Sequence, residues 1–177
     1  MIIQQAPPEW RTTHWFNTPA PLSLAALRGK VVMAVAFQML CPGCVAQGLP
    51  QALRVRETFC EDDVAVIGLH TVFEHHDAMT PVSLQAFLHE YRIAFPVGVD
   101  EPDPTGPLPR TMRAYEMRGT PTTLLFDREG RLHHHAFGHV PDLQLGSELM
   151  ALVEERDPTL ALEAGQVSGA CTPDGCS

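Results

Sequence analysis

Seven consecutive apolar residues, from Val31 to Phe37, form the longest hydrophobic run of the chain. A run without a polar face is typical of a central β-strand that is covered by helices on both sides. Residues 64–70 repeat this pattern and predict a second buried strand. Both runs are far too short to cross a bilayer, so the sequence predicts no membrane-spanning segment and no membrane partner.

The remaining segments show the spacing of helices and of shorter strands. Helices are expected over residues 45–59, 83–92, 110–117 and 143–155, with a single helical turn at residues 22–29. Short strands are expected around residues 14–16, 95–99, 122–126 and 132–137, of which the last two form a hairpin. Pro50 is expected to kink the first long helix, because proline removes one backbone hydrogen bond.

The order of these elements predicts the fold class. Strands alternate with helices early in the chain, and a hairpin followed by a helix ends the pattern. We therefore expect an α/β fold, a three-layer sandwich with a mixed central β-sheet flanked by helices. Residues 1–20 are an expected lead-in, residues 21–156 the folded domain, and residues 157–177 a flexible tail rich in Gly, Ala, Ser and Pro.

Two cysteines in the run Leu40-Cys41-Pro42-Gly43-Cys44 follow the first buried strand and precede the first long helix. Free N–H groups at a helix N-terminus favour a thiolate, and proline suits the first helical position because it has no N–H. Cys41 is therefore predicted to be the attacking catalytic thiol, with Cys44 one turn deeper as the resolving thiol. A zinc site is the alternative, but the second pair, Cys171 and Cys176, has a different spacing and lies in the tail.

Charge and motifs restrict the partners. The chain has 12 Lys and Arg residues against 21 Asp and Glu residues, a formal charge of −9, and no basic run, which disfavours nucleic acid as a partner. No Gly-rich phosphate loop is present, so no nucleotide or flavin cofactor is expected. Residues 1–9 lack the basic start and apolar stretch of a secretory signal, which predicts a cytoplasmic location.

Further motifs match a known family in the same order along the chain. They are the segments LSL at 22–24, LRGKVV at 27–32, CPGC at 41–44, VIGLHT at 66–71, FPV at 95–97, GTPT at 119–122 and FDREG at 126–130. With them, residues 15–153 resemble the redoxin group of the thioredoxin superfamily, which includes TlpA-like and ResA-like disulfide reductases, and most of all its DipZ-type domains.

The resemblance implies a thioredoxin-like fold and a dithiol at Cys41 and Cys44 that cycles with its disulfide. It implies a cis proline at Pro121 beside the cysteines and a substrate groove lined by Pro42, Gly43, Thr120 and Pro121. The implied partners are a disulfide-containing protein substrate and an external thiol reductant.

Two positions depart from the superfamily pattern. Leu40 stands where many thioredoxins have Trp, and Val35 stands where they have a buried acid. The proton of the resolving thiol must therefore pass to another group, to water or to the substrate. Peroxiredoxins of the same superfamily have Thr and Pro three and seven residues before their reactive cysteine, where this chain has Gln38 and Ala34. A thiol peroxidase is the second enzymatic hypothesis.

Histidines supply the non-enzymatic alternative, metal handling with Cys41 and Cys44. On the strand expected at 132–137, His133 and His135 share one face and His134 points to the other, which gives too few convergent ligands, so no metal is predicted. His70 is interpreted as a strand-end residue hydrogen-bonded to the backbone, with tuning of a thiol pKa as the alternative.

Three further cysteines lie outside the CPGC run. Cys60, at the end of the first long helix, is interpreted as a partly buried small apolar residue. Cys171 and Cys176 prompt the hypothesis of a redox relay, in which a tail disulfide exchanges electrons with Cys41 and Cys44.

Overall fold

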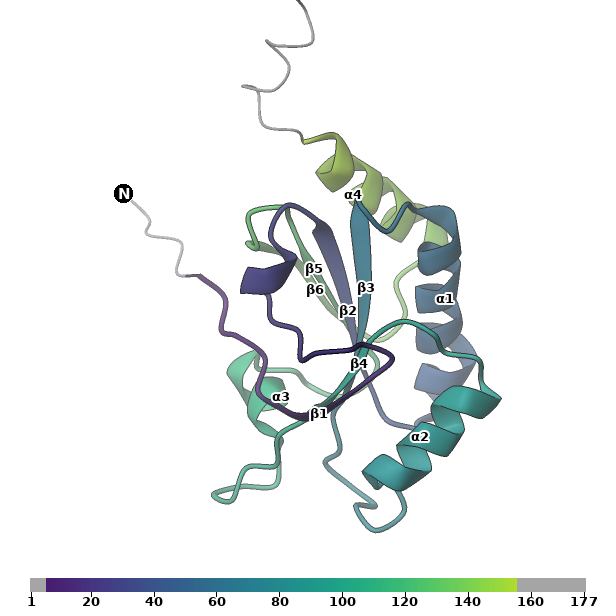
Figure 1. Ribbon diagram of the computed structural model, residues 1–177, viewed down its shortest axis with the longest axis vertical. Helices are drawn as coiled ribbons and strands as arrows, with labels where there is room; N and C mark the ends of the chain where they lie inside the picture. The colour runs from purple at the N-terminus through teal and green to yellow at the C-terminus, as the bar shows by residue number, and fades with distance from the viewer. Residues whose placement is uncertain (1–5, 156–177) are drawn as a thin grey trace, which may run out of the picture.

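A six-stranded mixed sheet forms the middle layer of the computed structural model, which describes residues 6–155 (Figure 1). The strands are β1 (Thr12–Phe16), β2 (Val31–Phe37), β3 (Val64–His70), β4 (Val97–Asp100), β5 (Thr122–Phe126) and β6 (Leu132–Phe137), in the spatial order β1-β4-β3-β2-β5-β6. β2, β3 and β4 run parallel, whereas β5, β6 and β1 are antiparallel to their neighbours. The predicted mixed sheet is confirmed.

Helices cover both faces of the sheet. The helical elements are η1 (Ala25–Leu27), a π-helical turn η2 (Cys44–Gly48), α1 (Leu49–Thr58), α2 (Pro81–Glu90), α3 (Arg110–Ala114) and α4 (Asp142–Glu154). α1, α2 and α4 pack on one face, against the odd-numbered side chains of β2 from Val31 to Phe37. α3 and residues near η1 cover the other face. The three-layer sandwich predicted from the order of elements is therefore observed.

The central strand β2 has the predicted bounds and is buried along its whole length. It pairs with β3 on one side and with β5 on the other. Because both of its faces are covered by helices, neither set of alternate side chains contacts water. The segment that follows β2 is thereby fixed at the carboxyl-terminal edge of the parallel strands.

Some helix boundaries differ from the prediction for local reasons. α2 begins at Pro81 rather than at residue 83, because the Thr80 side chain accepts a hydrogen bond from the Ser83 N–H (3.2 Å) and caps the helix. α3 ends at Ala114 rather than at residue 117, and Glu116 has a positive φ of 51°. Such a φ is incompatible with a continuing right-handed helix.

Pro50 directly follows a π-helical turn in the first long helix. The helix begins at Pro42, widens into the π-helical turn η2 and continues as α1, with Pro50 in the first turn of α1. The Leu49 N–H bonds to the Cys44 carbonyl, five residues back. The wider turn makes room for a proline ring that would otherwise meet the carbonyl four residues earlier.

Two residues lie in environments other than those expected. Cys60 is exposed just after α1, so the interpretation as a partly buried residue is wrong. His70 is fully buried beside Phe37, with 5.3 Å between the ring centroids, and neither of its ring nitrogens has a hydrogen-bond partner within residues 6–155. The expected bond to the backbone is therefore absent from the described part of the chain.

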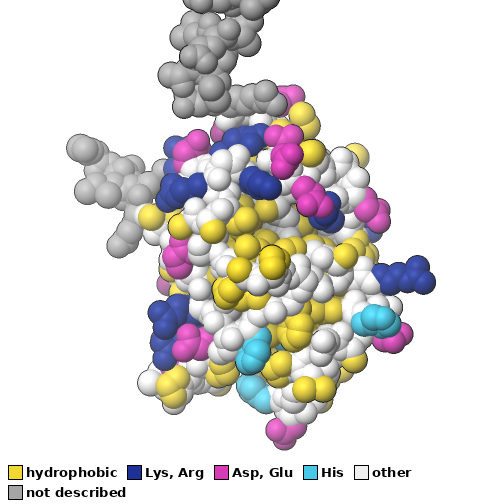
Figure 2. All heavy atoms as spheres, in the orientation of Figure 1, with side chains coloured by type: hydrophobic (Ala, Val, Ile, Leu, Met, Phe, Trp, Pro, Cys, Tyr) yellow, Lys and Arg dark blue, Asp and Glu magenta, His cyan; other side chains and the backbone are white. Residues whose placement is uncertain are grey.

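The surface is mixed in character. Figure 2 shows basic and acidic side chains interspersed around a central area of hydrophobic side chains on the face that it draws. Among residues 6–155, no helix combines the length and the apolar character that crossing a membrane requires.

Candidate active site

Cys41 lies between the end of β2 and the first turn of the helix. Its N–H donates to the Gln38 carbonyl (3.2 Å), which forms a tight turn after the strand, and its own carbonyl accepts from the Val45 N–H (3.1 Å). The Cys41 side chain is half-buried, and its Sγ accepts a hydrogen bond from the backbone N–H of Cys44 (3.3 Å). An N–H of the first helical turn thus points at the sulfur, as expected for a position that stabilises a thiolate.

Cys44 has a contrasting environment. Its side chain is fully buried, and burial raises the pKa of the thiol to about 12, with a smaller contribution in the same direction from the side chain of Cys41. Contacts with the Gln38 backbone and the Thr120 side chain lower the Cys44 pKa but do not offset burial. Cys44 is therefore a neutral thiol at neutral pH, while Cys41 is the sulfur that reaches the surface.

The Thr120–Pro121 peptide bond is cis, as the resemblance implied, and lies beside the two cysteines. The Cys41 thiol donates a hydrogen bond to the Thr120 carbonyl (3.4 Å). A Cβ atom added at Gly43 would lie 3.4 Å from Pro121 Cδ, so the proline ring packs against the first turn of the helix. The structure thus brings together the residues expected to line a substrate groove: Pro42, Gly43, Thr120 and Pro121.

Gly48 also belongs to this contact, although sequence reasoning missed it. A Cβ atom at Gly48 would lie only 3.0 Å from Pro121 Cβ and 3.8 Å from Val35 Cγ1. The absence of a side chain therefore lets the helix approach the cis proline closely. A glycine inside a predicted helix was the signal that marked this position.

Gln38 is a second residue whose structural role the sequence did not reveal. The sequence showed only that Gln38 stands where peroxiredoxins have threonine. Its side chain is buried, accepts the Phe73 N–H on Oε1 (3.1 Å) and donates to Glu74 (3.3 Å). Its backbone carbonyl accepts from Cys41. Gln38 therefore ties the CPGC loop to the segment that follows β3.

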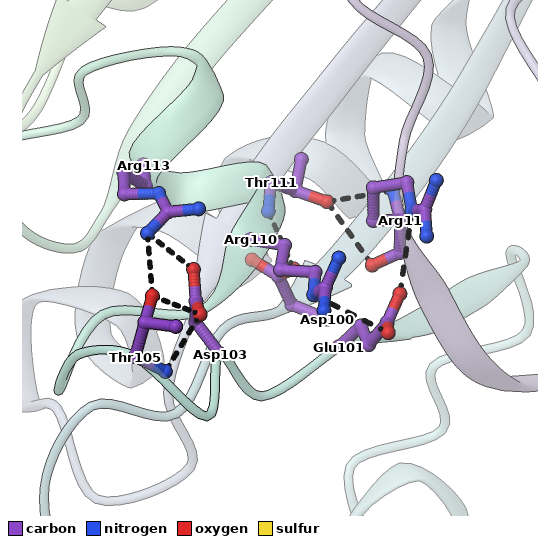
Figure 3. Close-up of polar contacts among 8 residues, drawn as sticks. All are labelled: Arg11, Asp100, Glu101, Asp103, Thr105, Arg110, Thr111 and Arg113. Atoms are coloured by element: carbon purple, nitrogen blue, oxygen red, sulfur yellow. Dashed lines mark hydrogen bonds and ion pairs between the residues drawn. The ribbon is translucent and has the colours of Figure 1, made fainter.

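A buried carboxylate, Asp100, joins the end of β4 to the start of α3 (Figure 3). It accepts hydrogen bonds from the backbone N–H groups of Thr111 (2.8 Å) and Met112 (3.0 Å) and from the Thr71 hydroxyl (2.6 Å). Burial raises the Asp100 pKa despite these bonds. The contacts hold α3 against β4, and the chain runs from α3 into the Thr120–Pro121 segment.

Salt bridges reinforce the same region. Glu101 pairs with Arg11 and Arg110, both at 3.3 Å, and Asp103 pairs with Arg113 (Figure 3). These pairs close the loop between β4 and α3. The loop is thus fixed by ion pairs around a buried Asp100 rather than by regular secondary structure.

The three strand histidines do not converge on the cysteines. His133 contacts Asp127 (2.9 Å) and His135 contacts the Tyr115 carbonyl (2.9 Å), whereas His134 pairs with Glu148 on α4 (2.8 Å). The predicted alternation of faces is observed. Within residues 6–155, no three His, Cys, Asp or Glu side chains are grouped as metal ligands. Cys171 and Cys176, the hypothetical relay, lie outside the described residues.

The fold and this site define a thioredoxin-like protein with a cysteine pair at a helix N-terminus beside a cis proline. Residues 4–135 match the AhpC/TSA family, and the chain belongs to that family. It is a redoxin of the TlpA-like type in the thioredoxin superfamily. This group belongs to the thioredoxin-like thiol–disulfide oxidoreductases. No curated protein matches the sequence.

Solved structures agree with this assignment. A thioredoxin-like superfamily protein, SPOA0173, is 60% identical with a TM-score of 0.84, over 86% of this chain and 99% of that one. A thiol-disulfide isomerase from Corynebacterium glutamicum is 46% identical with a TM-score of 0.83, over 88% of this chain and 100% of that one. A thioredoxin-like protein in its oxidized form, 22% identical over 89% of this chain and 100% of that one, shares the fold with a TM-score of 0.71.

Proposed function

We propose that this protein exchanges disulfides with protein substrates through Cys41 and Cys44. The observation that carries the proposal is the Cys44 N–H aimed at Cys41 Sγ, with the cis Thr120–Pro121 bond on the other side of that sulfur. This arrangement supplies an accessible cysteine at the start of a helix and a second thiol one turn away. The 46% identity to a thiol-disulfide isomerase supports the same chemistry.

The cycle has two exchange steps. The Cys41 thiolate attacks one sulfur of a substrate disulfide, forms a mixed disulfide and releases the other substrate sulfur as a thiolate. Val35 stands where many thioredoxins have a buried acid, so the Cys44 proton passes to the released thiolate, to water or to another group. The Cys44 thiolate then attacks Cys41 Sγ, releases the second substrate thiolate and leaves a Cys41–Cys44 disulfide. An external dithiol reductant returns the pair to its reduced form.

Insulin reduction in the presence of dithiothreitol tests this function. The native protein is expected to accelerate the reaction, and Cys41→Ser is expected to abolish the acceleration. Cys60→Ser is the matched control, because Cys60 is exposed after α1 and outside the site. Equal rates for the native protein and Cys41→Ser would reject the proposal. A Cys44→Ser variant should retain its partner as a stable mixed disulfide, which identifies the substrate by mass spectrometry.

Thiol peroxidase activity is a second candidate, favoured by the match to the AhpC/TSA family. The geometry supports it less well, because the position three residues before Cys41 holds Gln38, whose side chain is engaged by Phe73 and Glu74. No hydroxyl is available there to orient a peroxide. Rapid consumption of micromolar hydrogen peroxide by the reduced protein, lost in Cys41→Ser, would favour the peroxidase.

A further inference from the structure

Arg118 directly precedes the Gly119-Thr120-Pro121 segment and is exposed. Its guanidinium carbon lies 5.8 Å from the centre of the Phe137 ring, within the range of a cation–π contact. Phe137 is itself 51% exposed. A cation and an aromatic ring are thus held together at the surface next to the proposed substrate groove.

Gly119 explains how this pair is positioned. A Cβ atom at Gly119 would lie 2.8 Å from Cε2 of Phe137 and 3.2 Å from its Cζ, so the ring rests directly on the Gly119 backbone. Phe137 is also opposite Thr122 in the β5–β6 pair. Any side chain at position 119 would displace the ring, and with it the support for Arg118.

Within residues 6–155, the Arg118 guanidinium has no carboxylate partner. Most arginines between residues 6 and 155 pair with a carboxylate, but no carboxylate in that range pairs with Arg118. The chain as a whole carries a formal charge of −9. Arg118 is therefore an exposed cation that is available to a substrate. It lies two residues before Thr120, whose carbonyl is 3.4 Å from Cys41 Sγ.

We propose that Arg118, supported by Phe137, selects polypeptide substrates that carry an acidic side chain close to the reacting cysteine. This inference rests on the proposed disulfide exchange and adds a specificity element to it. A substrate whose disulfide reaches Cys41 beside Thr120 comes close to Arg118 and Phe137, because Gly119 joins this pair to Thr120. The attraction is that of an exposed ion pair, which corresponds to about a two- to five-fold preference.

The experiment uses three short peptides that differ only at one position next to a cysteine of an intramolecular disulfide, with Glu, Gln or Lys there. The fully reduced protein is mixed with each peptide, and its oxidation is followed by acid quench and mass spectrometry. We expect the rate constants to decrease in the order Glu, Gln, Lys. The difference should shrink at 1 M salt, where exposed charges are screened.

Two variants and a control isolate the contribution of Arg118. In Arg118→Gln the ratio of the Glu to the Gln rate constants should fall to about one, and in Arg118→Glu the Lys peptide should become the preferred substrate. Arg28→Gln removes the same charge at the opposite end of β2 and should keep the native ratio. Equal rates for all peptides with the native protein, or an unchanged ratio in Arg118→Gln, would overturn the inference. No exchange with any peptide would overturn the proposed function as well.

Discussion

The backbone N–H of Cys44 donates to Sγ of Cys41 across 3.3 Å, so the two cysteines are linked even as free thiols. One residue supplies the N–H, and the other places its sulfur, half-buried, within reach of the surface. The buried Cys44 thiol has its pKa raised to about 12, mainly by desolvation. The pair is therefore asymmetric before any substrate binds, and this asymmetry assigns the order of the two exchange steps.

Alkylation should report this asymmetry directly. At pH 8 a thiol with a pKa near 12 is ionised in roughly one molecule in ten thousand, and Cys44 is also shielded from solvent. Iodoacetamide should therefore modify Cys41 and the exposed Cys60 of the reduced protein and leave Cys44 free, as read by peptide mass mapping. Modification of Cys44 before Cys41 would contradict the assigned roles.

Gly48 should be intolerant of even a methyl group. Gly48→Ala places a Cβ 3.0 Å from Pro121 Cβ, so the cis proline must shift and the rate of disulfide exchange should fall. Gly146→Ala on α4 is the matched control, because its Cβ would meet nothing within 4 Å. The control should gain about 0.5–1 kcal/mol in the free energy of unfolding from helix propensity. An equal gain in Gly48→Ala, with full exchange activity, would refute the packing argument.

Gln38 should act as a positioning residue. In Gln38→Ala the half-buried Phe73 N–H loses its acceptor, which should cost about 0.5–1.5 kcal/mol in urea unfolding. The same change should also reduce kcat/KM for insulin reduction, because the turn that holds Cys41 loses its anchor. Gln144→Ala, which removes only an exposed contact with Glu148, should change stability by less than about 0.5 kcal/mol. Comparable losses in the two variants would argue against a special role for Gln38.

His70 should make stability depend on pH. Burial lowers its pKa from 6.5 to about 4, so between these values the unfolded chain binds the proton and the folded protein does not. The free energy of unfolding should therefore fall by about 3 kcal/mol as the pH decreases from 6.5 to 4, and should be insensitive to this group above 6.5.

The comparison with His70→Phe isolates this contribution. Burial raises the Asp100 pKa, so above pH 3.8 the folded protein keeps a proton that the unfolded chain loses. Asp100 therefore raises the free energy of unfolding as the pH decreases, which opposes His70. Other carboxylates titrate in the same pH range. The difference between the native protein and His70→Phe cancels these groups. Identical slopes from pH 6.5 to 4 in urea titrations of the two proteins would show that His70 does not remain neutral in the fold.

Local patterns in the sequence determined several parts of the structure. The apolar run from Val31 to Phe37 became β2 with the predicted bounds, because a segment without a polar face is stable only between two covered faces. The hairpin strands also have their predicted bounds, and the position of Cys41 before the helix follows from the strand, Pro42 and the helical pattern after it.

Only the tertiary structure decided what surrounds the two sulfurs. Gln38, Gly48 and His70 have their roles through contacts with Phe73, Pro121 and Phe37, and each contact joins segments that are distant along the chain. Periodicity records which face of an element is apolar, but it contains no information about which distant atom meets that face. Burial of Cys44, and hence its raised pKa, likewise depends on packing that no local pattern specifies.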